Sequence, residues 1–442
     1  MERFNTVRRF AVVVVLNMAD QAPQHHHQPL QFPEGFLWGT ATSAHQVEGN
    51  NKNNDWWEWE QKPGRLRSGL ACDSWHRYQE DFALVHALHN NAHRLSIEWS
   101  RVEPREGEFD EQALAHYRQM LQTLKDRQIK VMLTLHHFTN PLWLARRGSW
   151  ENRQAVFYFE RYVRKVVAVL GDLVDFWITI NEPLVLVGQS YIIGAWPPEK
   201  KNWWTGLKVF RHLAKAHRRA YRAIHEETQQ HWGKTAAVGF ANNVSSFYAY
   251  RKHSLSDQLF VQLFDWIFDH SFYSFTKGAH DFLGLNYYFH YRVTSASAAN
   301  FQNMLAVRRE KREVSDVGWE IYPQGIFEVL TDLQSYGKPI YITENGLATT
   351  NDDKRQRFLV SYLKEIYHAI QAGIDIRGYF HWSLLDNFEW EKGFTARFGL
   401  IEVDFETQAR RPRASFEIYR RLARENAINH DLMHLLGHAI HK

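Results

Sequence analysis

The sequence predicts an α/β protein, a single-domain (β/α)₈ TIM barrel, and two observations support this prediction. Short apolar runs rich in β-branched and aromatic residues recur along the chain, and most are followed by a segment of helical periodicity. Strands that alternate with helices predict parallel βα units. Eight such units in one chain predict a closed barrel rather than an open sheet.

The strands and helices can be assigned in chain order. The predicted strands are residues 36–42, 93–99, 130–137, 175–182, 236–242, 281–288, 338–344 and 377–385. Amphipathic segments between them predict helices, the clearest being residues 111–127, 154–170, 207–230 and 353–372. No tandem repeat or linker interrupts residues 32–425, so we expect one barrel domain over this range.

Both ends of the chain differ in composition from this domain. Residues 1–31 hold Arg8 and Arg9, a short apolar run and a polar, His-rich stretch, which we interpret as a disordered leader. An export signal is the alternative interpretation, and the apolar run is far too short to span a bilayer. Residues 426–442 carry leucines at helical spacing and predict a C-terminal tail with a short surface helix.

Composition excludes several classes of protein. The net charge is +4, with acidic and basic residues interspersed, so we expect no nucleic-acid partner. The single cysteine, Cys72, excludes an intrachain disulfide and fits a reducing compartment, which predicts a cytoplasmic location. The histidines are scattered, and neither a zinc-binding nor a phosphate-binding motif is present. Apolar residues make up 44% of the chain, enough for a large core.

Two predicted strands end on a glutamate. The stretch PIYITENG, residues 339–346, is a strand-like run that ends at Glu344, where Asn-Gly turn chemistry follows. The stretch DFWITINEP, residues 175–183, ends in the same way at Glu182. The carboxyl ends of parallel barrel strands meet on one face, which is where barrels of this kind carry their active sites. We therefore expect the two carboxylates to lie in one pocket.

Other polar and aromatic side chains collect at the same strand ends. They are Gln46, Arg94, His137, Asn181, Asn286, Tyr288 and Trp382. Any one of them alone can equally be a cap that completes the barrel by hydrogen bonding to its neighbours. The whole set, together with Glu182 and Glu344, predicts an active site.

Two glutamates surrounded by hydrogen-bond donors and tryptophans suit glycosidic bond cleavage. One carboxyl must protonate the leaving oxygen while the other, ionised, attacks the anomeric carbon. Arg94 and Tyr288 are expected to hold Glu344 ionised, and Asn181 is expected to bind the sugar 2-hydroxyl. The remaining hydroxyls are assigned to Gln46, His137 and Glu389, and the apolar ring faces to Trp382 and Trp390. For a retaining reaction the two carboxyl groups should lie roughly 5–5.5 Å apart.

These motifs resemble family 1 glycoside hydrolases, the β-glucosidase and β-galactosidase group. The resemblance runs from about residue 32 to residue 425, with FLWGTATSAHQVEG at the start and NEP at 181–183. It continues with NYY at 286–288, TENG at 343–346, and HWSLLDNFEW at 381–390 followed by RFGL. It implies a retaining β-glycosidase, most nearly a β-glucosidase tolerating galactose or fucose, that needs no cofactor or metal. Its partners would be small β-glycosides and short β-linked oligosaccharides, with no membrane.

The resemblance also implies residue roles. Glu182 matches the acid/base and Glu344 the nucleophile. Positions around the innermost sugar are matched by Gln46, His137, Asn181, Glu389 and Trp390, and positions that orient the nucleophile by Arg94, Asn286 and Tyr288. Members that hydrolyse phosphorylated sugars carry a Ser and a Lys/Tyr pair after the eighth strand. Here that region holds Glu389, whose charge would repel a phosphate, so an unphosphorylated substrate is favoured.

Three departures from the family pattern stand out. Strand three ends in His136-His137-Phe138-Thr139, so the contact of the usual Trp is expected to be lost or replaced by Phe138. Residues 244–280, between strands five and six, form a shortened region, and residues 347–355 are also compact. We expect residues 244–280 to be more mobile than the rest and able to expose a cavity or accept an unusual ligand.

Three other functions stay open at this point. Transglycosylation would use the same residues, with a sugar or alcohol in place of water. A non-catalytic carbohydrate-binding barrel would be expected to lack Glu182 or Glu344, and both are present. A planar cofactor in the exposed wall is suggested by Trp266, Phe268, Phe272 and Tyr273, although core packing is the commoner role for aromatics at this spacing. The preferred sugar and the oligomeric state are not specified by the sequence.

Overall fold

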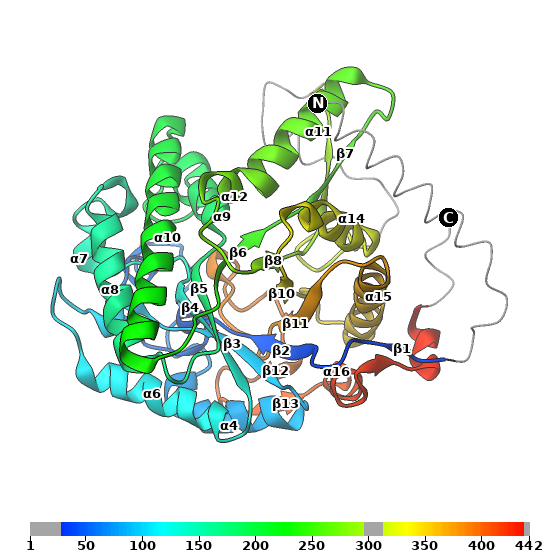
Figure 1. Ribbon diagram of the computed structural model, residues 1–442, viewed down its shortest axis with the longest axis horizontal. Coiled ribbons are helices and arrows are strands. Elements are labelled where there is room, and N and C mark those ends of the chain that lie inside the picture. Colours follow the sequence, from blue (N-terminus) through cyan, green and yellow to red (C-terminus); the bar gives the residue numbers. More distant parts are fainter. Residues whose placement is uncertain (1–27, 296–312, 437–442) are drawn as a thin grey trace.

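The computed structural model describes residues 28–295 and 313–436, and its centre is a closed barrel of parallel strands (Figure 1). Around the barrel the strands follow the order β10-β11-β2-β3-β4-β5-β6-β8. Their bounds are β2 (Leu37–Ala41), β3 (Ala92–Ser96), β4 (Lys130–His136), β5 (Phe176–Asn181), β6 (Val238–Asn243), β8 (Leu283–Asn286), β10 (Ile340–Asn345) and β11 (Ile376–Trp382). Each predicted strand overlaps one of these, and the predicted (β/α)₈ barrel is confirmed.

Long helices follow most of the strands and surround the barrel (Figure 1). They are α4 (Ser74–Ala87), α6 (Glu111–Lys125), α8 (Ala155–Leu170), α10 (Trp203–Trp232), α14 (Gln324–Leu333), α15 (Asp352–Gln371) and α16 (Ala414–Glu425). Helix α10 begins at Trp203 rather than at the expected Leu207, because the Asn202 side chain accepts a hydrogen bond from the Thr205 backbone and caps the helix there.

Shorter elements fill the loops. The short helices are α2 (Ala44–Val47), α3 (Asp55–Glu60), α5 (Trp99–Val102), α7 (Leu142–Ala145), α9 (Pro183–Val187), α11 (Leu255–Asp265) and α12 (Ser271–Phe275). The 3₁₀ segments are η1 (Ser149–Glu151), η5 (Gln334–Tyr336), η6 (Trp390–Lys392) and η7 (His430–Leu436), and the π-helical ones are η2 (Gly188–Ile193) and η3 (Trp266–His270). Small two-stranded sheets pair β1 (Leu30–Gln31) with β14 (Ala427–Ile428), β7 (Ser246–Ala249) with β9 (His290–Val293), and β12 (Ile401–Val403) with β13 (Arg410–Pro412).

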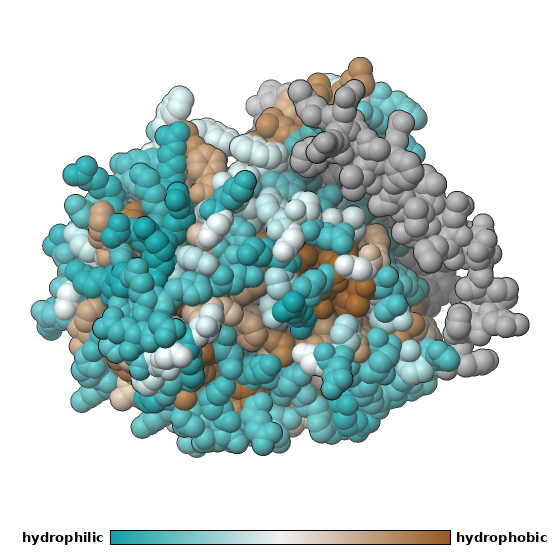
Figure 2. Space-filling view, in the orientation of Figure 1, coloured by the Kyte–Doolittle hydropathy of each residue, from teal (hydrophilic) through white to brown (hydrophobic). Residues whose placement is uncertain are grey.

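The barrel strands are buried on both faces, as continuous apolar runs in a parallel barrel require. Inside the barrel, Leu37, Met132, Ile178 and Phe380 pack together. A second and larger cluster fills the layer between the strands and the outer helices. Polar side chains cover most of the face shown in Figure 2, with apolar residues gathered in patches between them. The barrel is therefore a packed scaffold, and the end where its strands terminate is free to carry a site.

The first and last strands that the structure describes, β1 and β14, pair with each other. Residues 1–27 of the predicted leader lie outside the described residues, but Leu30 and Gln31 pair antiparallel with Ile428 and Ala427. The β1–β14 pair thus includes residues on both sides of the barrel domain predicted over residues 32–425. The helix expected in the C-terminal tail is the 3₁₀ segment η7, whose Leu432 is buried and packs in the outer core.

The shortened region after β6 holds β7, α11, η3 and α12 before β8 begins. Three leucines of α11, spaced one turn apart at Leu255, Leu259 and Leu263, are exposed. Of the aromatics considered for a planar cofactor, Phe272 and Tyr273 are buried in the core, where Phe272 packs against Phe240. The expected mobility of residues 244–280 stays a prediction.

Candidate active site

Both candidate carboxylates lie where a barrel strand ends. Glu344 is the penultimate residue of β10, and Glu182 directly follows β5. Their residues are 4% and 7% exposed, so both side chains are almost removed from solvent. Glu182 adopts a left-handed backbone conformation, with φ 44° and ψ 60°, between β5 and the first turn of α9. A side chain other than glycine is held in that conformation only when its surroundings compensate for the strain.

Glu344 is held by one cation and one phenol. The Arg94 guanidinium, which enters from β3, pairs with Oε1 of Glu344 at 2.5 Å. The Tyr288 hydroxyl donates to Oε2 at 2.6 Å. Burial, followed by the charge of Glu344, raises the pKa of Tyr288 well above its usual value, so the phenol keeps its proton and remains a donor. Each oxygen of Glu344 therefore accepts a hydrogen bond, and the side chain has a fixed orientation.

Glu182 is held differently, by two amides on one oxygen. Asn286 Nδ2 donates to Oε1 of Glu182 at 2.9 Å, and Asn243 Nδ2 donates to the same oxygen at 3.0 Å. No cation forms an ion pair with Glu182 among the residues that the structure describes. Burial and the charge of Glu344 raise the pKa of Glu182 to about 7, although these amide hydrogen bonds oppose the rise. A carboxyl with this pKa can hold a proton near neutral pH.

Asn181 connects the two carboxylates. Its Oδ1 accepts from Arg94 Nη2 at 2.6 Å and from Asn286 Nδ2 at 3.2 Å. The chain of contacts thus runs from Glu344 through Arg94, Asn181 and Asn286 to Glu182. Glu182 and Glu344 therefore share one buried network at the carboxyl end of the barrel, although they are far apart in the sequence.

The residues expected to bind sugar hydroxyls lie beside this network. Gln46 Nε2 donates to Glu389 at 3.0 Å and to Asn387 at 3.1 Å, and Gln46 Oε1 accepts from Ser43 at 2.6 Å. Burial and the charge of Glu344 raise the pKa of Glu389 to about 8. Gln46 and Glu389 thus form one polar pair, held in a fixed geometry near the carboxylates.

His137 completes the polar wall between two tryptophans. Its ring lies nearly parallel to those of Trp382 and Trp390, with ring centres 6.0 and 6.1 Å away. Asn181 Nδ2 contacts His137 Nε2 at 3.2 Å. Burial, helped by Arg94, lowers the pKa of His137 well below its usual value, so the imidazole is neutral and can exchange hydrogen bonds with a hydroxyl.

Phe138 supports the tryptophan side of the pocket. Its ring meets the ring of Trp390 edge-on with centres 5.2 Å apart, and it also packs against Trp196. Trp390 has a left-handed backbone conformation, with φ 50°, and its side chain is buried against these rings. Phe138 therefore fills the space beside Trp390 with an aromatic ring.

Two features of the site differ from the sequence analysis. Asn286, expected to orient the nucleophile, donates instead to Glu182 and Asn181 and accepts from Thr343 at 2.7 Å. This difference arises from the barrel register, which sets Asn286 beside Asn243 at the ends of neighbouring strands β8 and β6. Asn243 itself was not expected to belong to the site, because no motif marks it and it lies one residue beyond the strand predicted over residues 236–242; in the structure it is the last residue of β6.

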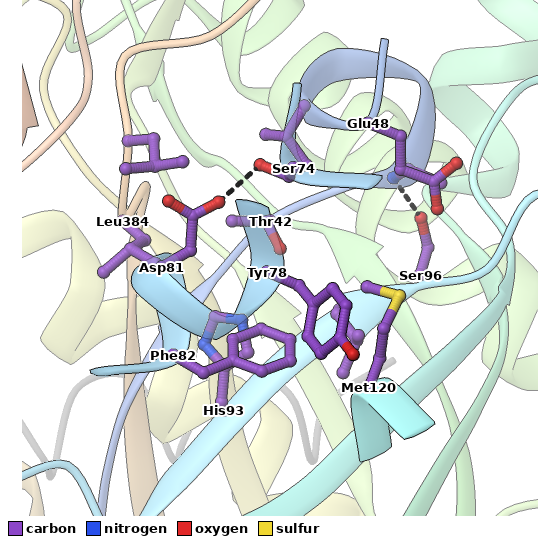
Figure 3. Close-up of a pocket in the computed structure, with 14 residues that line it drawn as sticks. Thr42, Glu48, Ser74, Tyr78, Asp81, Phe82, His93, Ser96, Met120 and Leu384 are labelled. Carbon is purple, nitrogen blue, oxygen red and sulfur yellow. Dashed lines mark hydrogen bonds between the residues drawn. The ribbon is translucent and has the colours of Figure 1, made fainter. Parts of the chain in front are cut away.

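A small cavity lies away from this site (Figure 3). It has a volume of about 20 Å³, enough for one water molecule, and lies outside the barrel between strands β2 and β3 and helices α4 and α6. Asp81 accepts from Ser74 at its edge, and His93 Nε2 has no partner there among the described residues. None of the predicted site residues lines it, so this cavity is not part of the active site.

Neither a metal cluster nor a membrane span was found in residues 28–295 and 313–436. No three His, Cys, Asp or Glu side chains gather there in a way that could hold a metal ion. No helix in the same residues is long and apolar enough to cross a bilayer.

The structure is a closed eight-stranded barrel in which two buried glutamates lie among hydrogen-bonding side chains and aromatic rings. This combination defines the class of the protein, a glycoside hydrolase. The model of glycosyl hydrolase family 1 matches residues 28–274 and 266–428, and the chain belongs to that family. Its curated relatives include a β-glucosidase A from Acetivibrio thermocellus, 31% identical over 90% of this chain and 99% of the relative. The protein is a β-glycosidase of this family.

Solved structures agree with the fold. A β-glycosidase from Pyrococcus horikoshii has a TM-score of 0.85 at 38% identity, covering 92% of this chain and 98% of that one. A β-glucosidase from Thermotoga maritima in complex with glucoimidazole has a TM-score of 0.84 at 29% identity, covering 90% and 99%. The whole globular part of this chain thus follows the architecture of these enzymes.

Proposed function

We propose that the protein is a retaining β-glycosidase, most active on unphosphorylated β-glucosides and tolerant of galactose and fucose. One observation supports this most directly: the two glutamates share a network but have unlike surroundings. Glu344 is paired with the Arg94 cation, whereas Glu182 meets only neutral amides and has a pKa raised to about 7. Such a division suits one ionised nucleophile and one proton donor.

In the first step Glu344 attacks the anomeric carbon while Glu182 protonates the leaving oxygen, so the aglycone departs as a neutral alcohol. The sugar is then joined to Glu344 by an ester bond. In the second step the ionised Glu182 removes a proton from water, which attacks the same carbon from the face opposite Glu344. The ester breaks, Glu344 regains its charge, and the sugar leaves with its original anomeric configuration.

The sugar specificity follows from the groups around the pocket. Gln46, Glu389 and His137 offer both donors and acceptors, which suits hydroxyls on neighbouring ring carbons. Glu389 offers no cation where a phosphorylated substrate would need one, which disfavours a 6-phosphate. The names of the relatives, β-glucosidase and β-galactosidase, support tolerance of both sugars. Measuring kcat/KM with nitrophenyl β-glucoside, β-galactoside and β-fucoside ranks the three sugars as substrates.

The mechanism is tested by replacing the proposed nucleophile. Glu344→Gln is expected to lower turnover of nitrophenyl β-glucoside by at least about 10⁴-fold, because the covalent step is lost. Glu58→Gln is the matched control, since the Glu58 side chain is 59% exposed on α3 and should leave turnover unchanged. Proton NMR of the first product should show the β anomer. Normal turnover of Glu344→Gln, or a first product with inverted configuration, would contradict the proposal.

Two finer statements complete the proposal. The reaction as written needs no metal or organic cofactor, so dialysis against EDTA should leave turnover unchanged. A loss of turnover that an added metal restores would overturn this statement.

A cytoplasmic location is supported by the single cysteine, Cys72, which is buried. Transglycosylation is measured by adding an alcohol and separating the alkyl glycoside from the free sugar.

A further inference from the structure

The two oxygens of Glu182 have different surroundings. Oε1 accepts from Asn286 Nδ2 at 2.9 Å and from Asn243 Nδ2 at 3.0 Å. Oε2 accepts no hydrogen bond from the residues that the structure describes. An oxygen that already accepts two amide hydrogens is a poor place for a proton, because that proton would point toward the donors. The unpartnered Oε2 is the place where a proton fits.

Asn286 and Asn243 are not held equally firmly. Asn286 is fully buried, and Thr343 fixes its amide by donating to Oδ1 at 2.7 Å. Asn243 ends the neighbouring strand β6, beside Asn286 in register, and is only half-buried. The second donor to Oε1 therefore comes from a residue that is partly exposed to solvent.

We propose that Asn243 is a positioning residue for the acid/base step: with Asn286 it keeps Oε1 of Glu182 as an acceptor, so that Oε2 alone carries the catalytic proton. This inference rests on the proposed function and deepens it by assigning the reacting atom. Oε2 protonates the leaving oxygen in the first step and removes the proton from water in the second.

The pH dependence follows from the groups around Glu182. The charged and titratable groups that act on it are Glu344 from β10, Arg94 from β3, Tyr288 after β8 and Glu389 after β11. Hydrogen bonds from the two amides favour the ionised form of Glu182 and hold its pKa below the value that burial alone would give. Loss of Asn243 therefore raises that pKa, and the alkaline limb of kcat/KM moves to higher pH.

The experiment compares Asn243→Leu and Asn243→Asp with the native enzyme. Leucine has nearly the same shape and no donor, so the alkaline limb should move up by roughly one pH unit. Aspartate adds a carboxylate beside Glu182 and should move the limb further. With an alkyl β-glucoside, whose leaving group needs a proton, kcat/KM of Asn243→Leu should fall about tenfold more than with a dinitrophenyl β-glucoside.

A double-mutant comparison separates positioning from a general structural effect. In the Glu182→Gln background, with the dinitrophenyl substrate, adding Asn243→Leu should change the rate of the first step by less than about twofold, because there is no proton left to position. A thermal unfolding transition for each variant shows that it is folded. If Asn243→Leu does not fold, Asn243→Asp, which keeps the shape and polarity of the side chain, replaces it in the comparison.

The outcomes distinguish this inference from the proposed function. If the native enzyme turns over β-glucosides but both Asn243 variants keep its alkaline limb, the positioning role is wrong while the glycosidase remains. An equal loss from Asn243→Leu in the native and Glu182→Gln backgrounds would also overturn it. Absence of any β-glycoside turnover in the native enzyme would instead overturn the proposed function.

Discussion

Individual side chains give Glu182 and Glu344 different chemistry. A guanidinium and a phenol bind the two oxygens of Glu344, whereas two amides bind a single oxygen of Glu182. Because both carboxyls are buried, these neighbours decide where the negative charge is stable. Arg94 is central, since its three donor nitrogens contact Thr134, Asn181 and Glu344.

Arg94→Lys tests the role of this guanidinium. A lysine keeps the charge but cannot donate to Glu344 and Asn181 in the same planar arrangement. We expect kcat/KM for nitrophenyl β-glucoside to fall by about 10²–10³-fold, with little change in circular dichroism. Arg105→Lys is the control, because the Arg105 side chain is 78% exposed and should tolerate the change. An Arg94→Lys enzyme within threefold of the native rate would show that the bridging geometry is dispensable.

The raised pKa of Glu182 also has a consequence for stability. The folded protein keeps a proton on Glu182 up to about pH 7, whereas in the unfolded chain it is released near 4.5. The contribution of Glu182 to the free energy of unfolding therefore decreases as the pH rises from about 4.5 to about 7. Glutamine cannot ionise, so Glu182→Gln should be more stable than the native enzyme by roughly 1–3 kcal/mol at pH 8 and not at pH 4. Urea unfolding at both pH values measures this, and a pH-independent difference would contradict it.

The sequence motifs predicted well which residues gather at the site. They predicted less well which of these residues contact one another. The NYY motif predicts Asn286 at the site, but only the register of β6, β8 and β10 determines that it meets Glu182. Asn243 carries no motif in the sequence, and its role depends on the same register. Contacts across strands far apart in the chain are not encoded in local periodicity, which is why these two assignments could not be made from the sequence.

At the level of strands and loops, the segment that follows β10 brings two parts of the site together. The Gly346 that follows the strand lies so close to β11 that an added Cβ would be 1.7 Å from the Trp382 carbonyl oxygen. Glycine is therefore required for the close approach of the backbone after β10 to Trp382 at the end of β11. The sequence predicted that the strand stops at a turn formed by Asn345 and Gly346, but β10 continues through Asn345, and the close contact between the backbones was not predicted.

Gly346→Ala is expected to push β10 and β11 apart at their carboxyl ends. The predicted result is a loss of more than about 100-fold in kcat/KM together with a lower melting temperature, since a buried clash of this kind costs several kcal/mol. Gly188→Ala is a suitable comparison, because an added Cβ at Gly188 meets nothing within 4 Å and its φ is negative. Melting curves and nitrophenyl β-glucoside assays of both variants decide the point. Equal behaviour of the two would contradict the close-packing explanation.

For the whole molecule, the alternation of strand-like and helical segments predicted the architecture, although periodicity alone marks the strands at residues 36–42 and 236–242 only weakly. Apolar runs of strand length and amphipathic helices of the right spacing predicted all eight barrel strands, because burial on both faces forces a continuous apolar pattern. Small peripheral sheets, such as the one that pairs β1 with β14, depend on a few backbone hydrogen bonds. Their strands carry no apolar pattern in the sequence comparable to that of the barrel strands. The barrel then carries the strand ends, and with them Glu182 and Glu344, to one face.

The central claim is that Glu344 forms a covalent bond to the sugar while Glu182 moves the proton. Dinitrophenyl 2-deoxy-2-fluoro-β-glucoside tests it most directly, because the fluorine slows both steps and the good leaving group restores the first, so the intermediate accumulates. Mass spectrometry of the intact protein and of its peptides should show one fluoroglucosyl group, attached to Glu344. A label on another residue, or full turnover of ordinary β-glucosides with no label after long incubation, would contradict the account.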